Sequence, residues 1–282
     1  MSLFHMPVSV STKLNGLIAK FIWGGLDKKT IHWLCWSTLC KPKLCGGLGL
    51  CDLKTKNSAL LNKWLWRYGT EYDKLWRRVI NAKYEDGAQW LLPRNSQINN
   101  RKSWIWRNIA KPLSDPADVF AQHLRLTVGD GSRIDFWNDK WTGNESLKER
   151  FPRVYALAVQ KQGCIAEFGN SNNGRWVWAI QLRRSLFDWE KEVWTNFQSL
   201  LEQFKPGLIG EDSVRWDAST NGFYKPAEFR QLLENSSCVN DPVWKIVWSN
   251  LAPPSVEAFV WKLIHGRIPT RTELVKRGIN SI

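Results

Sequence analysis

The sequence has 282 residues, 43% of them apolar and 23% charged, and this mixture excludes a disulfide-stapled miniprotein and a wholly disordered chain. Forty Lys and Arg against twenty-six Asp and Glu leave a net charge of +14. Residues 1–110 hold 18 basic and 6 acidic side chains, so this segment alone carries +12. Because each Lys or Arg near a phosphate releases condensed counterions, such a segment attracts nucleic acid. The alternative is a merely solubilising surface.

The first third of the sequence is predicted to be mainly helical. Apolar residues recur at helical spacing over residues 10–22 and stop at Gly24-Gly25. Residues 30–50 are predicted to be extended or loop. Helices are expected at 55–68 and 72–84, with Gly69 as the stop between them, and at 101–110. The helix over 72–84 combines an apolar stripe with basic residues around it.

Two β-hairpins are predicted further along the chain. The first joins 124–128 to 133–137 through Gly129-Asp130-Gly131, and the second joins 214–217 to 223–224 through Asn221-Gly222. Residues 169–175 are predicted to form a flexible joint, followed by a long helix from Trp178 to about Phe204. Helices are also expected near 227–234, 242–250 and 255–265. The expected fold class is therefore α+β, predominantly helical with two small β-hairpins, in segments 1–110, 111–168 and 176–282.

The aromatic and sulfur-containing residues allow a structural and a functional interpretation. The 19 Trp could stack on bases, but most lie in runs rich in Leu, Ile and Val, which favours burial. Cys35, Cys40, Cys45 and Cys51 lie near His32, a set of ligand types that zinc prefers. Their gaps of four, four and five residues contain no short ligand pair, which argues against zinc and favours packing as small apolar residues. Sequence alone does not decide whether these four cysteines bind metal, and we expect no metal site and no cofactor.

No membrane anchor or catalytic constellation is expected from the sequence. The apolar stretch at 14–26 is too short to cross a bilayer, and residues 1–10 lack the features of a secretory signal. We therefore expect reduced cysteines and an intracellular protein, nuclear or cytoplasmic. The sequence contains no aromatic-x-Asp-Asp motif, and no Ser or Cys nucleophile is paired with a His, so we expect no enzymatic activity.

Several blocks together resemble the region downstream of the polymerase domain in plant LINE-type, non-LTR retrotransposon reverse transcriptases. The blocks are Phe21–Gly25, Ile31–Trp33, Leu39–Lys43, Gly46–Gly49, Ala59–Arg67, Val128–Gly131, Ile134–Trp141, Phe151–Arg153, Trp244–Trp248, Pro253–Trp261, Ile268–Thr270 and Arg277–Ile279. The resemblance implies a parent polyprotein that copies RNA into DNA. Residues 1–110 would follow its catalytic palm, and 176–282 would start its zinc-binding domain. The zinc ligands of that domain would lie beyond Ile282.

We therefore predict a noncatalytic retroelement fragment that binds RNA or DNA backbone without sequence specificity, with no preference assigned between the two. The expected phosphate contacts are Lys63, Arg67, Lys74, Arg77, Arg78 and Lys83 on two helices, with Lys41 and Lys43 in a loop. The alternative is a structural or protein-interaction remnant that packs against other polyprotein segments, or a decayed copy.

Overall fold

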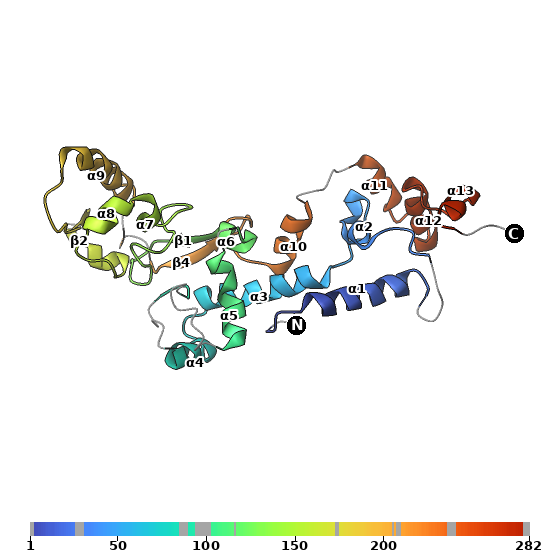
Figure 1. Cartoon of the computed structure of the whole chain (residues 1–282), viewed down its shortest axis with the longest axis horizontal. Helices are drawn as coiled ribbons and strands as arrows, with labels where there is room; N and C mark the ends of the chain where they lie inside the picture. Colours follow the sequence, from blue (N-terminus) through green and yellow to red (C-terminus); the bar gives the residue numbers. More distant parts are fainter. Residues whose placement is uncertain are drawn as a thin grey trace. The chain divides into compact units, whose positions relative to one another are not determined.

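The computed structural model describes residues 3–25, 31–84, 90–93, 103–115, 117–172, 175–204, 206, 210–235 and 241–278. Helices dominate this described part, and its strands form two small antiparallel two-stranded sheets (Figure 1), which confirms the α+β, predominantly helical class. The chain forms two compact units. The terminal unit comprises Met1–Leu60 and Phe229–Ile282, and the central unit comprises Leu61–Glu228.

The terminal unit builds its core from two distant parts of the sequence. Its elements are α1 (Val8–Ile22), α2 (Trp36–Cys40), the 3-10 turn η1 (Lys43–Cys45), α11 (Pro242–Val247), α12 (Pro254–Ile264), α13 (Arg271–Lys276), and parts of α3 (Leu53–Thr70) and α10 (Pro226–Asn235). Leu39, Val247 and Trp261 form a buried cluster, against which further Trp and Leu side chains pack. The indole Nε1 of Trp261 donates to the carbonyl oxygen of Gly46 at 2.8 Å. This buried hydrogen bond satisfies the polar edge of a ring that is otherwise in apolar surroundings.

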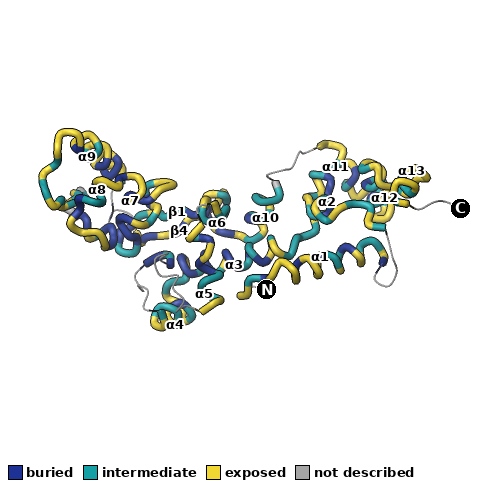
Figure 2. The backbone as a smooth tube through the Cα atoms, viewed as in Figure 1, coloured by how far each residue is buried: buried dark blue, intermediate teal, exposed yellow. Residues whose placement is uncertain are grey.

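Helix α1 matches the helix expected at 10–22, but its polar side faces the protein. The helix is exposed along much of its length (Figure 2) and buries Ser11, Asn15 and Ala19. Asn15 Nδ2 donates to Asp52 Oδ2 at 2.7 Å, and Asn15 Oδ1 accepts from the Leu53 amide at 3.4 Å. These contacts fix α1 to the start of α3, so its apolar stripe, which includes Leu17, is exposed.

The central unit is built around stacked aromatic rings. Its elements are the remainder of α3 and α10, α4 (Leu75–Tyr84), α5 (Trp104–Ala110), η3 (Lys111–Ser114), α6 (Val119–His123), β1 (Leu124–Thr127), α7 (Leu147–Arg150), α8 (Pro152–Leu157), η4 (Ile165–Phe168), β2 (Gly169–Asn172), β3 (Arg175–Trp178), α9 (Asp188–Leu201) and β4 (Ser213–Trp216). Phe136 stacks on Phe168 with ring centroids 4.1 Å apart, and Trp137 stacks on Phe197 at 5.8 Å. All four rings are buried, as expected for large aromatic side chains in a core.

The strand pairing differs from both predicted hairpins. Strand β1 pairs antiparallel with β4, from Leu124 opposite Trp216 to Thr127 opposite Ser213, and not with residues 133–137. The Trp216 amide donates to the Gly222 carbonyl at 2.9 Å, so the second predicted turn is present, but residues 223–224 form no strand. The hairpin that does form is β2–β3, on residues that were expected to be a flexible joint. The two compact units accordingly do not divide at 169–175.

Several helix boundaries also differ from expectation. Residues 36–40 form α2 within a segment predicted to be extended or loop. Helix α3 runs through Gly69 to Thr70, and a Cβ added at Gly69 would lie 2.7 Å from Val214 Cγ2. Gly69 therefore permits close packing and is not a helix stop. The helix predicted from Trp178 begins only at Asp188, because residues 175–178 belong to β3. Helices α10, α11 and α12 form near their expected positions.

Candidate nucleic-acid interface

Four of the predicted phosphate contacts are exposed side chains of the central unit. Lys74 directly precedes α4, Arg78 and Lys83 lie on it, and Lys63 lies on α3. No acidic residue occurs in α4. Within the described parts of the chain, none of the four has an ion-pair partner, whereas seven Arg and Lys of the same unit, among them Arg125, Lys191 and Lys225, pair with carboxylates. The four charges therefore remain available to an anionic partner.

Two other predicted contacts are already engaged inside the protein. Arg67 binds Glu71 through two hydrogen bonds of 2.7 and 2.9 Å, and its guanidinium lies 4.5 Å from the centre of the Trp64 ring. Arg77 is only 1% exposed, and its Nη2 donates to the Trp90 carbonyl at 2.6 Å. Burial lowers the pKa of Arg77. The prediction that Arg77 contacts phosphate is therefore wrong, because this position of α4 faces the interior.

The loop lysines belong to the other unit. Lys41 and Lys43 are exposed on the terminal unit, where the Lys43 ammonium lies 4.9 Å from the centre of the Trp248 ring. The predicted site thus separates into one pair on the terminal unit and four cations on the central unit. Each group can meet a phosphate backbone independently, since such contacts need no shared pocket.

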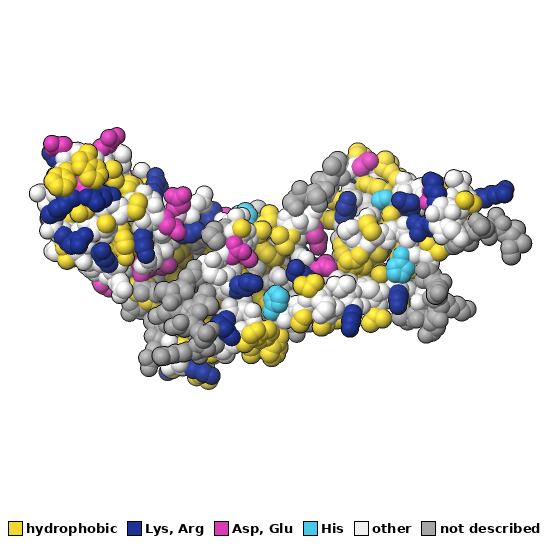
Figure 3. Space-filling model, in the orientation of Figure 1, with side chains coloured by type: hydrophobic (Ala, Val, Ile, Leu, Met, Phe, Trp, Pro, Cys, Tyr) yellow, Lys and Arg dark blue, Asp and Glu magenta, His cyan; other side chains and the backbone are white. Residues whose placement is uncertain are grey.

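A cluster of arginines and aromatic rings lies at the start of α9, where the sequence predicted no site. Phe187 and Trp189 are 55% and 62% exposed, with ring planes 20° apart and centroids 6.5 Å apart. The Arg184 guanidinium lies 4.1 Å from the Phe187 centroid, and that of Arg153 lies 5.1 Å from the Trp189 centroid. We call these four residues the aromatic platform. In Figure 3, hydrophobic and basic side chains lie next to one another over the region of α8 and α9.

A buried carboxylate organises the aromatic platform. Glu190 is 2% exposed and accepts hydrogen bonds from Arg153 Nε at 2.7 Å, from Arg184 Nη1 and Nη2 at 2.8 Å each, and from the Phe187 amide at 3.0 Å. The Arg184 hydrogen bonds, together with those from Phe187 and Arg153, lower the pKa of Glu190 to about 2. This carboxylate therefore stays ionised near neutral pH and holds both guanidinium groups in place. The adjacent Arg183-Arg184 pair beside two aromatic residues was the sequence signal for this cluster.

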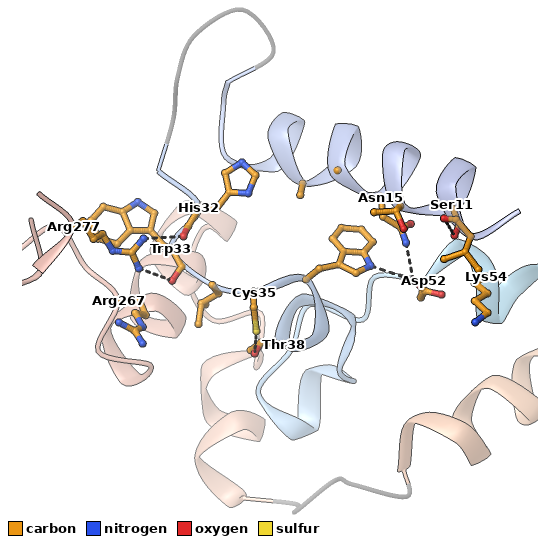
Figure 4. Close-up of a pocket in the computed structure, with 16 residues that line it drawn as sticks. Ser11, Asn15, His32, Trp33, Cys35, Thr38, Asp52, Lys54, Arg267 and Arg277 are labelled. Atoms are coloured by element: carbon orange, nitrogen blue, oxygen red, sulfur yellow. Dashed lines mark hydrogen bonds between the residues drawn. The ribbon is translucent and has the colours of Figure 1, made fainter. Parts of the chain in front are cut away.

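A pocket of about 780 Å³ lies within the terminal unit (Figure 4). Arg277 donates to the carbonyl oxygens of His32 and Trp33 at 3.0 and 3.2 Å, and its guanidinium lies 4.9 Å from the centre of the Trp33 ring. Burial opposes ionisation of Asp52, but hydrogen bonds to its carboxylate, including one from the Thr55 amide, outweigh burial and lower its pKa. Arg277 and Asp52 thus hold segments of the pocket wall together.

The described cysteines differ in reactivity and do not form a metal site. Cys35 is exposed in the pocket, and hydrogen bonds with Ser37 and Thr38, each at 3.1 Å, lower its pKa to about 7. Burial raises the pKa of Cys40 to about 12. Cys45 is disulfide-bonded, which corrects the expectation that every cysteine is reduced. Across the described ranges, no group of three or more His, Cys, Asp and Glu could hold a metal ion.

Comparisons with known proteins support a relation to retrotransposon reverse transcriptases, without specifying the type of element. The family described as zinc-binding in reverse transcriptase matches residues 224–282. The described residues of that range provide no zinc ligand set, and its His265 instead contacts the Gly46 carbonyl oxygen at 2.8 Å and stacks on Trp244.

Two proteins of Arabidopsis thaliana are similar to about half of the chain. A putative ribonuclease H protein, At1g65750, is 37% identical over 154 residues, which make up 53% of this chain but 24% of that protein. The uncharacterized mitochondrial protein AtMg00310 is 30% identical over 148 residues, which make up 52% of this chain and 92% of that protein. No solved structure matches the chain. Among the described helices, none is long and apolar enough to cross a membrane.

These matches define the chain as a protein related to the reverse transcriptases of retrotransposons. The chain belongs to the family of the Arabidopsis mitochondrial protein AtMg00310, nearly all of whose length it matches. It spans only about a quarter of the length of the putative ribonuclease H protein. No catalytic domain is evident from these matches.

Proposed function

We propose that the chain is a noncatalytic, retroelement-derived protein that binds the backbone of RNA or DNA without sequence specificity. The observation that carries this proposal is the group of exposed cations on and beside α3 and α4, Lys63, Lys74, Arg78 and Lys83, which form no ion pair with a carboxylate in the described structure. Lys41 and Lys43 add two exposed cations on the terminal unit. Arg67 is excluded because Glu71 neutralises it, and Arg77 because it is buried.

The physical basis of the proposed binding is counterion release. A cation with no acidic partner can replace a sodium ion condensed on the phosphate backbone, and the released ion gains entropy. An arginine already paired with a carboxylate would first have to give up that interaction. Phosphate contacts of this kind fix position and orientation but carry no base information, so the expected binding is independent of sequence.

Fluorescence anisotropy with a labelled structured RNA and a matched DNA duplex tests the proposal over a range of salt concentrations. Replacing Lys63, Lys74, Arg78 and Lys83 together by Ala should weaken binding and reduce the salt slope by roughly 3, since each phosphate contact contributes about 0.7–0.9. A matched control removes the same number of exposed cations that are each paired with a carboxylate: Lys191, Lys225, Arg267 and Lys276.

Comparing the salt slopes of the two variants shows whether binding depends on these four side chains or on net charge. A reduced slope in the first variant together with a nearly unchanged slope in the control supports the proposal. Equal reductions in both would mean that net charge alone governs binding, and an unchanged slope in the first variant would refute the assignment of these side chains.

The exposed apolar stripe of α1 favours a second candidate function, in which the chain packs against another segment of a retroelement polyprotein. Leu14, Leu17 and Phe21 are all exposed, and contiguous apolar surface of this kind marks sites of protein association. Replacing Leu17 and Phe21 by Gln should then reduce the binding of an apolar dye without lowering the melting temperature. Undiminished dye binding would exclude this stripe as the surface concerned.

A further inference from the structure

We propose that the aromatic platform, Phe187 and Trp189 with Arg153 and Arg184, is a stacking site for an unpaired base of single-stranded nucleic acid. The proposed backbone contacts do not distinguish single strands from duplexes, whereas this site would bind only a base that is not paired. It concerns a different surface of the central unit and does not require those contacts to be correct.

The exposure of Trp189 sets it apart from the other tryptophans. Of the 19 tryptophans, only Trp104 and Trp189 are exposed, at 49% and 62%. The remaining rings are buried or half-buried, as is usual for so large an apolar side chain. Trp189 is therefore the most exposed tryptophan, and Phe187, which is 55% exposed, lies beside it. Two adjacent large rings left in contact with water mark an interaction surface.

The rings are held in a defined arrangement before any ligand binds. Phe187 immediately precedes the first turn of α9, Trp189 lies within that turn, and the Phe187 amide is bonded to Glu190. The ring planes lie within 20° of each other, so the rings form nearly parallel surfaces. Arg184 and Arg153 each cover part of one ring, and both are anchored on the buried carboxylate of Glu190. The binding of a base here would therefore cost little conformational entropy, because the protein side chains are already ordered.

The charge around the platform fits a nucleic-acid strand. Arg153, Arg183 and Arg184 lie around the rings, and Arg153 and Arg184 share the buried Glu190. The exposed Asp188 pairs with Lys191 at 2.7 Å, and Glu192 is exposed one turn further along α9. Arg183 is exposed, and its guanidinium donates to the Ala156 carbonyl. Within the described structure Arg183 has no carboxylate partner, so it can meet a phosphate while a base stacks on the rings, which is how proteins hold single strands.

The geometry favours single strands over duplexes for a physical reason. In a duplex the faces of the bases are already stacked on their neighbours, so a platform of rings can reach only edges and backbone. In a single strand the base faces are accessible, and each base stacked on an aromatic ring contributes about a 5- to 150-fold increase in affinity. The platform should therefore add affinity for single strands selectively.

Anisotropy with a labelled oligothymidine of about 12 nucleotides and a blunt duplex of the same length tests the proposal on the full chain. The double variant Phe187→Ala and Trp189→Ala should bind the single strand at least about 5-fold more weakly, with an unchanged salt slope and unchanged duplex affinity. Trp189→Phe retains an aromatic face and should recover most of the lost affinity. Trp104→Ala removes the other exposed tryptophan and serves as the matched control, with little effect expected.

Several results would overturn the proposal. They are wild-type affinity for the single strand in the double variant, equal losses on single strand and duplex, or an equal loss in Trp104→Ala. The melting temperature of each variant checks its fold, and both platform rings are exposed, so their removal should leave it nearly unchanged. The two proposals can fail separately. The cations on and beside α3 and α4 are tested by the change in salt slope, and the platform is tested by the change in single-strand affinity at constant slope.

Discussion

The substitution Asp212→Asn should destabilise the central unit by about 2–3 kcal/mol. The Asp212 side chain is buried, and its Oδ1 accepts from the amides of Gly129 at 2.7 Å and Gly131 at 2.9 Å, while its Oδ2 accepts from the Arg133 amide at 2.9 Å. Asparagine can keep the two hydrogen bonds on its oxygen but turns an NH₂ group toward the Arg133 amide. That substitution loses a charge-assisted hydrogen bond and leaves a partly buried donor without a partner, which costs about 1–3 kcal/mol, and the two remaining bonds lose their charge assistance.

Thermal unfolding followed by circular dichroism measures this effect. In a unit of this size, each kcal/mol shifts the melting temperature by about 2–4 °C, so a decrease of roughly 4–12 °C is expected. Asp130→Asn is the control, because among the described residues the exposed Asp130 carboxylate accepts hydrogen bonds from Ser132 alone, and the substitution should change stability by less than about 0.5 kcal/mol. A shift for Asp212→Asn no larger than that of the control would refute the conclusion that this carboxylate holds the 129–133 loop.

Two further predictions concern a thiol and a glycine. Alkylation of Cys35 should follow a thiolate titration with a midpoint near pH 7, while Cys40, with its pKa of about 12, should stay unmodified in the folded protein; mass spectrometry of peptides alkylated between pH 5 and 9 checks both. Gly69→Ala should lower the melting temperature although alanine favours helix, since overpacking against Val214 costs about 1–3 kcal/mol against a helical gain of about 1. In a Val214→Ala background the same change should become stabilising, and destabilisation in both backgrounds would contradict the steric explanation.

Local patterns in the sequence located most helices but did not reveal the pairing of the strands. Periodicity placed α1, α3, α10 and α12 to within a few residues, because their apolar spacing and flanking Gly or Pro act over one or two turns. The Gly129-Asp130-Gly131 turn carried a strong local hairpin signal. In the structure, Asp212 binds that turn from 80 residues away, and β1 pairs with β4. Such contacts leave no local periodicity, so one sequence does not disclose them.

The composition of the sequence indicated which segment is basic, but not which of its basic side chains are exposed. The charge excess drew attention to Lys63, Lys74 and the other cations of α3 and α4, whose contact with phosphate stays a prediction. The burial of Arg77 was not foreseeable, because the face of a short basic helix that turns inward depends on tertiary contacts. The aromatic platform was missed because Trp189 fitted the inner face of a helix predicted to start at Trp178; with that segment forming a strand and a loop, Trp189 is exposed.

The terminal unit also has a consequence for how the chain can acquire its fold. The contact between Gly46 and Trp261 spans 215 positions, and that between His32 and Arg277 spans 245. The core of the terminal unit can therefore form, during synthesis, only after residues 229–282 have been made, whereas Leu61–Glu228 is continuous and can fold earlier. The region matched by the zinc-binding family shares its apolar cluster with Leu39, so residues 224–282 expressed alone would expose Trp261 and Val247 to water. In this protein that family region is half of a folding unit, and its partner half is encoded at the opposite end of the sequence.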